Sequence, residues 1–245
     1  MVSYFIQVYR HMSTDICIIM ELVANDILIK PASTLCVCGP SKSGKTCFVF
    51  NLIKHSSDMF KNGESPKKIL FCYSIQQPMY DEIQRMCGDK IEFFEGVPEI
   101  SKIQEFADGD HNLIVLDDMM HQVVKAENME NLFTLGSHHL HLSVIFISQN
   151  LFQQGKHART IALNTEYYIL YKNPRGSGQI NTLSKQLGKS LGGTLKSAYN
   201  DAVNITPYGY VFLDMTQHCP DNYRIRSGIL PGEQTVIYKP LKGLH

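Results

Sequence analysis

The chain has 245 residues, of which 44% are hydrophobic and 19% are charged, and these are the proportions of an ordinary globular protein. Lys and Arg together number 23, as do Asp and Glu, so the formal net charge is zero. No overall basic field would therefore hold nucleic acid. Any contact with DNA must come from a local patch or from several subunits arranged around the duplex.

The seven cysteines are scattered along the chain, and no second close pair completes a zinc site. They predict buried, reduced thiols in an intracellular protein. The first residues lack the charged and then apolar order of a signal peptide, and no apolar run approaches the ~20 residues of a membrane span. We therefore expect no membrane insertion.

Residues 1–33 give an ambiguous pattern, and the apolar run 17–23 fits either a strand or a helix. From Thr34 onward, strands and helices alternate. Strands are predicted at 35–38, 69–74, 91–94, 113–117, 144–148 and 167–171. Helices are predicted at 45–60, 79–87, 100–107, 128–138 and 156–163. Continuous apolar strands favour an α/β fold with a mainly parallel sheet covered by helices on both faces.

The C-terminal third begins with a predicted loop at 173–178. A helix is predicted at 179–189, with an interruption at 191–193 and a further helix at 194–203. Strands at 210–215 and 223–227 are predicted to form a closing pair. We expect one domain over 1–245: an N-terminal extension (1–33) that packs on the core, the core motifs (34–175), and C-terminal helices and closing strands (176–245).

The most informative motif lies between the first predicted strand and the first predicted helix of the core. Glycines at both of its ends let the backbone turn its N–H groups toward an anion, and the helix that follows adds the positive end of its dipole. Lys45 would reach the β- and γ-phosphates of ATP, and the Thr46 hydroxyl would coordinate Mg²⁺. The residues predicted to hold the nucleotide are Gly39, Pro40, Ser41, Lys42, Ser43, Gly44, Lys45, Thr46 and Cys47. This motif predicts a P-loop NTPase fold.

In a second motif an apolar strand ends in two carboxylates, Asp117 and Asp118. The carboxyl ends of strands in an α/β sheet face the crevice where ligands bind. In a phosphate-loop ATPase the first acid holds the Mg²⁺ shell, and the second activates the attacking water as a general base. We therefore predict Asp117 as a metal-binding residue and Asp118 as a catalytic one.

A third motif ends the next predicted core strand with two amides, Gln149 and Asn150. A glutamine at this place can hydrogen-bond the attacking water or the γ-phosphate. An ATPase that works between subunits often also needs an arginine from its neighbour. Of the six arginines, Arg159 is the first candidate for that role and Arg175 the second.

Together these residues resemble a known family. The phosphate loop, the Asp117–Asp118 pair, the run 146–152 and the segment 171–175 are similar to the genome-packaging ATPases of the FtsK–HerA superfamily. The resemblance covers roughly residues 34–175 and is greatest to the poxvirus-type ATPases of large DNA viruses, with relatives in adenovirus-like viruses and Polinton elements. Bacterial members commonly have a glutamate at the position of Asp118, whereas viral members often carry two aspartates.

The resemblance implies a RecA-like, ATP-driven motor that pumps double-stranded DNA into a preformed capsid, usually as a homo-oligomeric ring. If the roles of the family's motif residues are transferred to this sequence, Lys45 and Thr46 bind phosphate and Mg²⁺, Asp117 holds the metal and Asp118 activates water. Gln149 would act as the sensor that reports hydrolysis to the moving parts of the motor. Capsid or portal proteins would be its partners. The expected location is the nucleus or cytoplasm of the host cell, or the virion.

Other functions remain open at the level of sequence. A different P-loop DNA translocase or helicase would carry the same motifs. A small-molecule kinase would need an acceptor pocket and usually an arginine-rich lid, and no cluster of arginines follows Gln149. A structural protein that only retains a nucleotide would not need to keep all of the hydrolytic residues.

Overall fold

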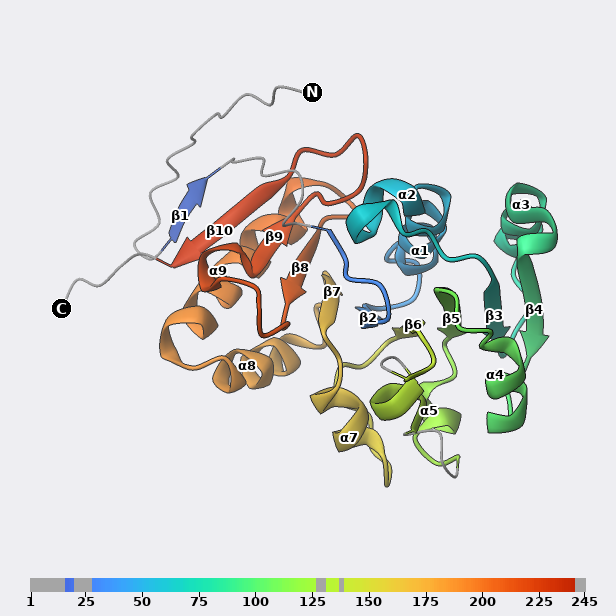
Figure 1. Ribbon diagram of the computed structural model, residues 1–245. Helices are drawn as coiled ribbons and strands as arrows, with labels where there is room; N and C mark the ends of the chain where they lie inside the picture. Colours follow the sequence, from blue (N-terminus) through green and yellow to red (C-terminus); the bar gives the residue numbers. More distant parts are fainter. Residues whose placement is uncertain (1–15, 20–27, 127–130, 137–138, 241–245) are drawn as a thin grey trace.

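A computed structural model describes residues 16–19, 28–126, 131–136 and 139–240. In this part of the chain a single sheet contains ten strands, in the order β1-β10-β9-β8-β7-β2-β6-β5-β3-β4 (Figure 1). The strands are β1 (Ile16–Ile19), β2 (Thr34–Cys38), β3 (Ile69–Tyr73), β4 (Ile91–Glu95), β5 (Asn112–Asp117), β6 (Leu142–Ser148), β7 (Tyr167–Tyr171), β8 (Tyr210–Asp214), β9 (Ile225–Ser227) and β10 (Val236–Pro240).

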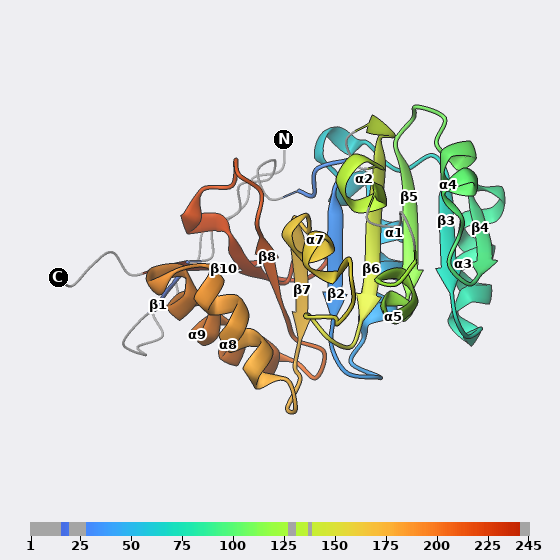
Figure 2. The ribbon, with the colours of Figure 1, turned by 90° about the horizontal axis from the view of Figure 1, so that it is seen from below.

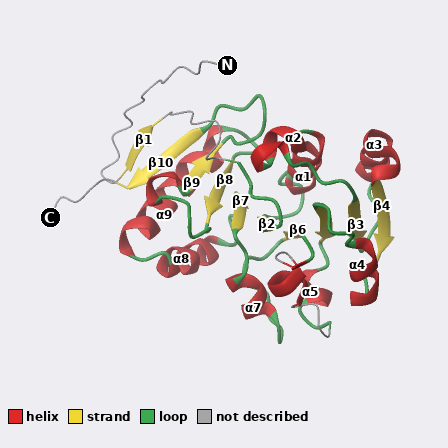
Figure 3. Cartoon of the chain, in the orientation of Figure 1, coloured by secondary structure: helices red, strands yellow, loops and turns green. Residues whose placement is uncertain are grey.

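Helices cover both faces of the sheet (Figures 1 and 3). One face carries α1 (Lys45–Lys54), α2 (Ser56–Met59) and α3 (Pro78–Cys87), and the other carries α4 (Ile100–Phe106), α5 (Met120–Val123), α7 (Ala158–Leu163), α8 (Ser177–Gln186) and α9 (Lys189–Ile205). Short helical turns occur at η1 (Lys61–Gly63), η2 (Gly88–Lys90), η3 (Leu132–Gly136, a π-helix) and η4 (Asp221–Tyr223).

The core consists of two apolar layers, one on each side of the sheet. Successive side chains of a strand point to opposite faces, so Leu35 and Val37 of β2 belong to the layer that contains α1, while Cys36 and Cys38 belong to the layer that contains α8 and α9. Because both faces are buried, the strands read as continuous apolar runs in the sequence.

The direction of the strands sets the position of the motifs. Strands β7, β2, β6, β5, β3 and β4 run parallel, and β8, β9, β10 and β1 continue the sheet antiparallel. The carboxyl ends of the parallel strands lie along one edge (Figure 2). The registers Cys38↔Ser148 and Asp117↔Ile147 bring the ends of β2, β5 and β6 to the same level there. The structure therefore has the predicted α/β fold with a mainly parallel sheet and helices on both faces.

Two helix predictions were wrong in their boundaries. The helix predicted at 45–60 divides at His55 into α1 and α2. The interruption predicted at 191–193 lies instead at Leu187 and Gly188, where Gly188 has φ of 79°, and α9 runs unbroken through Gly192. Gly192 serves close packing, because a Cβ there would lie 2.1 Å from the Ser184 carbonyl oxygen of α8. A glycine in sequence does not reveal which of these two roles it has.

Two further predictions concern the ends of the sheet. The predicted closing strands correspond to β8 and β9, which pair antiparallel, but β10 was not predicted and extends the sheet to β1. The helix predicted at 128–138 lies partly outside the described residues, and the described residues 132–136 within it form a π-helical turn. The division of the chain at residues 33 and 175 stays a prediction. In the described part, no helix is both long and apolar enough to cross a bilayer.

Candidate nucleotide-binding site

The loop between β2 and α1 is shaped by close backbone approaches. Gly39 is buried, and a Cβ on it would lie 2.6 Å from Tyr171 Cβ and 2.7 Å from Ser43 Oγ. Lys42 and Gly44 both have left-handed backbones, with φ of 64° and 99°. Such alternation turns successive N–H groups into a concavity that binds anions. The loop therefore has the form that a phosphate group requires, and the ten-residue helix α1 begins directly after it.

Lys45 is the buried cation of this loop. Its side chain is 8% exposed, and its Nζ donates a hydrogen bond of 2.8 Å to the Pro40 carbonyl oxygen. Burial lowers the pKa of the Lys45 ammonium, while the nearby Asp118, Cys38 and Asp117 oppose that shift. An ammonium held inside the loop in this way can transfer its hydrogen bonds to phosphate oxygens without leaving the site.

Asp117, the last residue of β5, lies opposite the first turn of α1. Its Oδ2 accepts hydrogen bonds from the Thr46 hydroxyl at 3.4 Å and from the Tyr80 hydroxyl at 2.8 Å. Burial raises the pKa of the Asp117 carboxyl, and the Tyr80 hydrogen bond counteracts this. Its neighbours Asp118 and Lys45 act in opposite directions on the same pKa. The predicted metal residues Thr46 and Asp117 are thus in contact.

Tyr80 was missed by the sequence analysis. It lies on α3, is 1% exposed, and stacks among aromatic side chains of β3 and β4. In sequence it has the apolar spacing of a core residue of an amphipathic helix. Only the folded position of α3 shows that its hydroxyl reaches the carboxylate.

Asp118 and Gln149 meet beside this pair at the same edge of the sheet. The Gln149 side-chain amide donates to Asp118 Oδ2 at 3.1 Å, and both residues are exposed. Asp118 has a left-handed backbone with φ of 53°, which turns the chain away from the direction of β5 immediately after Asp117. The two adjacent carboxylates therefore have different surroundings, one buried among hydroxyl groups and one exposed beside an amide.

The residues present fit a nucleotide with Mg²⁺. The Ser43 hydroxyl oxygen is buried in the loop and has no hydrogen-bond partner among the described residues, as expected of a donor whose acceptor is an external anion. The Thr46 hydroxyl and the Asp117 carboxylate are oxygen ligands of the kind that Mg²⁺ takes together with water and phosphate. Ser41, Lys42 and Cys47 are exposed around the loop.

The two candidate arginines differ in position. Arg175 follows β7 and lies at the same edge of the sheet as the loop, with its backbone N–H bound to the Asn173 side chain at 3.1 Å. Arg159 lies on α7, which Figure 2 shows near the opposite edge of the sheet. It lines a cavity of about 980 Å³ together with Lys30 and Glu166. Both arginines are exposed. The structure therefore brings neither of them into contact with the residues around Lys45.

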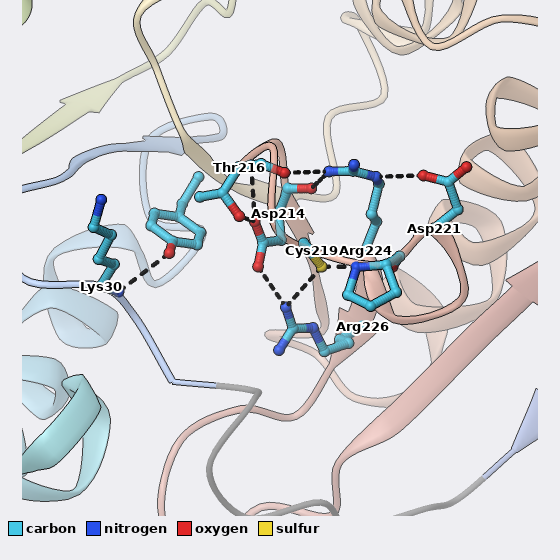
Figure 4. A network of polar contacts seen from close by, with 9 residues as sticks. Lys30, Asp214, Thr216, Cys219, Asp221, Arg224 and Arg226 are labelled. Carbon is cyan, nitrogen blue, oxygen red and sulfur yellow. Dashed lines mark hydrogen bonds and ion pairs between the residues drawn. The ribbon is translucent and has the colours of Figure 1, made fainter.

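Other arginines are held by the fold. Arg226 is fully buried and donates to Asp214 Oδ2 at 2.9 Å, and Arg224 binds Asp221 and the carbonyl of Thr216 (Figure 4). Within the described residues, no hydrogen bond or ion pair of the Arg159 or Arg175 side chain is found. These two guanidinium groups are therefore available to a partner, unlike those of Arg224 and Arg226.

Comparison with solved structures identifies the fold. The genome packaging NTPase B204 of Sulfolobus turreted icosahedral virus 2, in complex with ATP-gammaS, matches 86% of this chain and 98% of its own, with a TM-score of 0.52 and 12% identity. The chain has the fold of a P-loop NTPase. This confirms the fold predicted from the glycine loop.

Two further solved structures match with TM-scores below 0.5. The AMP complex of B204 matches 79% of this chain and 94% of its own at a TM-score of 0.46 and 11% identity. EssC (ATPases 2 and 3) from Geobacillus thermodenitrificans matches 85% of this chain but only 39% of its own, with a TM-score of 0.44 and 9% identity. No protein-family model matches the sequence. No curated protein matches it either.

Proposed function

We propose that this protein is an ATP-hydrolysing motor of the FtsK–HerA superfamily, which translocates double-stranded viral DNA into a preformed capsid. The observation that carries the proposal is the convergence of Lys45, Thr46, Asp117, Asp118 and Gln149 at one edge of the sheet. The fold that the chain shares over nearly the whole length of a viral genome-packaging NTPase supports this choice among P-loop proteins.

The residues have distinct roles in the proposed hydrolysis. The loop and Lys45 bind the phosphates, and Thr46 and Asp117 would hold Mg²⁺, which supplies positive charge to the β- and γ-phosphates when bound. Asp118 accepts a proton from the attacking water, and the Gln149 amide keeps that carboxylate and the water aligned. Catalysis is therefore mainly positioning and electrostatic stabilisation of the transferring phosphoryl group.

The motor is proposed to work as a homo-oligomeric ring, with capsid or portal proteins as further partners in the host nucleus or cytoplasm or in the virion. With zero net charge, one chain offers little long-range attraction to DNA, whereas a ring can surround the duplex and contact its backbone without reading sequence. An exposed arginine of one subunit completes the site of the next. The position of Arg159, at the edge opposite its own loop, favours it for that role over Arg175.

The test is the ATP hydrolysis rate of the purified protein with and without duplex DNA. The proposal predicts stimulation by DNA of any sequence, which declines as salt is raised. Asp118→Asn should abolish the stimulated rate while nucleotide binding persists, and Asp58→Asn, at an exposed acid on α2, should leave it unchanged.

The same assay separates the alternatives. If the rate of ATP consumption did not change with DNA and a small acceptor molecule became phosphorylated, the protein would be a kinase and the proposal would be overturned. Strand separation of the duplex would indicate a helicase. Mixing inactive Lys45→Ala subunits with Arg159→Ala subunits should restore part of the rate if the arginine acts on the neighbouring site.

A further inference from the structure

One exposed aromatic residue lies against the phosphate loop. Tyr208 occupies the turn between α9 and β8, its side chain is 64% exposed, and its Cδ1 lies 3.3 Å from where a Cβ on Gly44 would be. The turn is fixed: the Gly209 N–H donates to the Thr206 carbonyl at 3.0 Å, and a Cβ on Gly209 would lie 2.1 Å from the Ala202 carbonyl oxygen. Tyr208 is therefore held beside the loop by a tightly packed backbone.

The other aromatic residues around it are buried and support the loop from behind. The Tyr171 and Tyr210 rings lie 5.6 Å apart, and Phe48 of α1 meets Tyr210 edge to face at 5.2 Å. The Tyr171 hydroxyl is 3.5 Å from the Gly44 carbonyl oxygen. All three have apolar neighbours in the core, whereas Tyr208 presents its ring to solvent. Within the described residues, no hydrogen bond of the Tyr208 hydroxyl is found.

The order of the strands indicates how a bound nucleotide would be oriented in the site. The sheet runs β8-β7-β2-β6-β5, so β2, which carries the loop, has the strands of Asp117 and Gln149 on one side. On the other side are β7 and β8, and Tyr208 lies two residues before β8. A triphosphate whose terminal phosphate points to Asp117, Asp118 and Gln149 must extend its nucleoside end away from β5 and β6. That end lies on the side where Tyr208 is exposed.

We propose that Tyr208 is the stacking surface for the nucleobase of the bound nucleoside triphosphate. This inference rests on the proposed function, because it takes the loop to be a nucleotide site. An aromatic ring stacks on every base, and a purine offers it the larger face. The site would then bind purine nucleoside triphosphates more tightly than pyrimidine ones, with little dependence on the hydrogen-bonding pattern of the base.

The experiment compares a ligand that has a base with one that has none. Calorimetric titration with Mg²⁺ and ATPγS, and with Mg²⁺ and tripolyphosphate, is applied to the wild type, Tyr208→Ala and Tyr208→Phe. Ile205→Ala, at another exposed apolar side chain near the end of α9, is the matched control. We expect Tyr208→Ala to weaken ATPγS binding about tenfold, in line with the loss of one base–aromatic stack. Tripolyphosphate binding should not change, and the Phe and Ile205 variants should behave as wild type.

The outcomes separate the two proposals. Equal weakening of both ligands by Tyr208→Ala, or no change in ATPγS binding, would overturn the stacking role while the phosphate site stands. Failure of the wild type to bind either ligand would overturn the proposed function itself. Because the chain has no tryptophan, Tyr208→Trp adds a second readout. Its fluorescence should change with ATPγS and not with tripolyphosphate, and a response that is the same for both would also contradict stacking.

Discussion

Asp117 and Asp214 offer a comparison between two regions of one sheet. Each is the last residue of a buried strand, and the two are almost equally buried, at 3% and 4% exposed. They lie at opposite edges, because β8 runs antiparallel to the strands that carry the motifs. Sequence position and burial therefore do not distinguish them.

Their partners do. The Asp214 carboxylate accepts hydrogen bonds from Arg226 at 2.9 Å and from both the backbone amide and the hydroxyl of Thr216 (Figure 4). The Arg226 guanidinium also lies 4.9 Å from the centre of the Phe212 ring. Asp117 receives only hydroxyl groups in the described structure, and the nearby Lys45 ammonium binds a carbonyl oxygen instead. Asp214 is thus paired with a cationic side chain of the same chain. Asp117 has no such ion pair among the described residues, and we infer that a bound cation would supply the positive charge. This difference supports the proposed metal-binding role of Asp117.

The largest effect is expected on the structural side of the comparison. Arg226→Met leaves Asp214 buried without its cation and should lower the free energy of unfolding by about 3–5 kcal/mol. Urea unfolding measures it, with Arg85→Met as the control because that exposed side chain bonds only to its own helix. A double variant Asp214→Asn/Arg226→Met should recover much of the loss. If the single variant were as stable as wild type, the pair would not be structural.

On the functional side, the proposed role of Asp117 predicts that Asp117→Asn lowers Mg²⁺-dependent ATP hydrolysis about a hundredfold or more, because the proposed metal site would lose its charged ligand. The substitution should not lower the free energy of unfolding. Burial raises the pKa of this carboxyl above that of the unfolded chain, so ionisation costs stability in the folded state. The free energy of unfolding contributed by Asp117 therefore falls as pH rises through the raised pKa.

This pH dependence of stability can be tested without measuring enzyme activity. Without nucleotide or metal, the Asn variant should melt above wild type at neutral pH, and the gap should close as pH falls toward the usual range of an aspartate. Melting curves across pH measure this. A variant that melts lower than wild type at neutral pH would contradict this account, because it would mean that the Asp117 charge stabilises the fold.

A smaller effect is expected from Tyr80→Phe, which removes only the hydroxyl that holds Asp117 Oδ2. We expect a loss of roughly 1 kcal/mol in stability and a several-fold rise in the Mg²⁺ concentration needed for half-maximal hydrolysis. Tyr167→Phe is the control, since it removes a buried hydroxyl bonded to the Lys30 amide, away from the loop. An equal shift in Mg²⁺ dependence for both variants would reduce Tyr80 to a packing residue.

The sequence alone predicted which residues lie together at the carboxyl ends of the parallel strands, and there is a physical reason for this. Gly39 and Gln149 directly follow parallel strands and Asp117 ends one, and the carboxyl ends of parallel strands must lie at the same edge of the sheet. It failed where a residue has two possible roles. Tyr80 has the pattern of a core residue, and Gly188 and Gly192 are both glycines although one ends a helix and the other lets two helices touch. These roles depend on which elements become neighbours.

The most direct test of the whole account is Mg²⁺-dependent phosphate release from ATP by the wild type, Lys45→Ala and Lys54→Ala. Lys45 lies in the loop, and Lys54 is an exposed lysine at the far end of the same helix. The account predicts hydrolysis by the wild type and by Lys54→Ala, and a loss of about a hundredfold or more in Lys45→Ala. Equal rates for all three proteins, or no hydrolysis by the wild type with Mg²⁺, duplex DNA and enough protein to form oligomers, would contradict it.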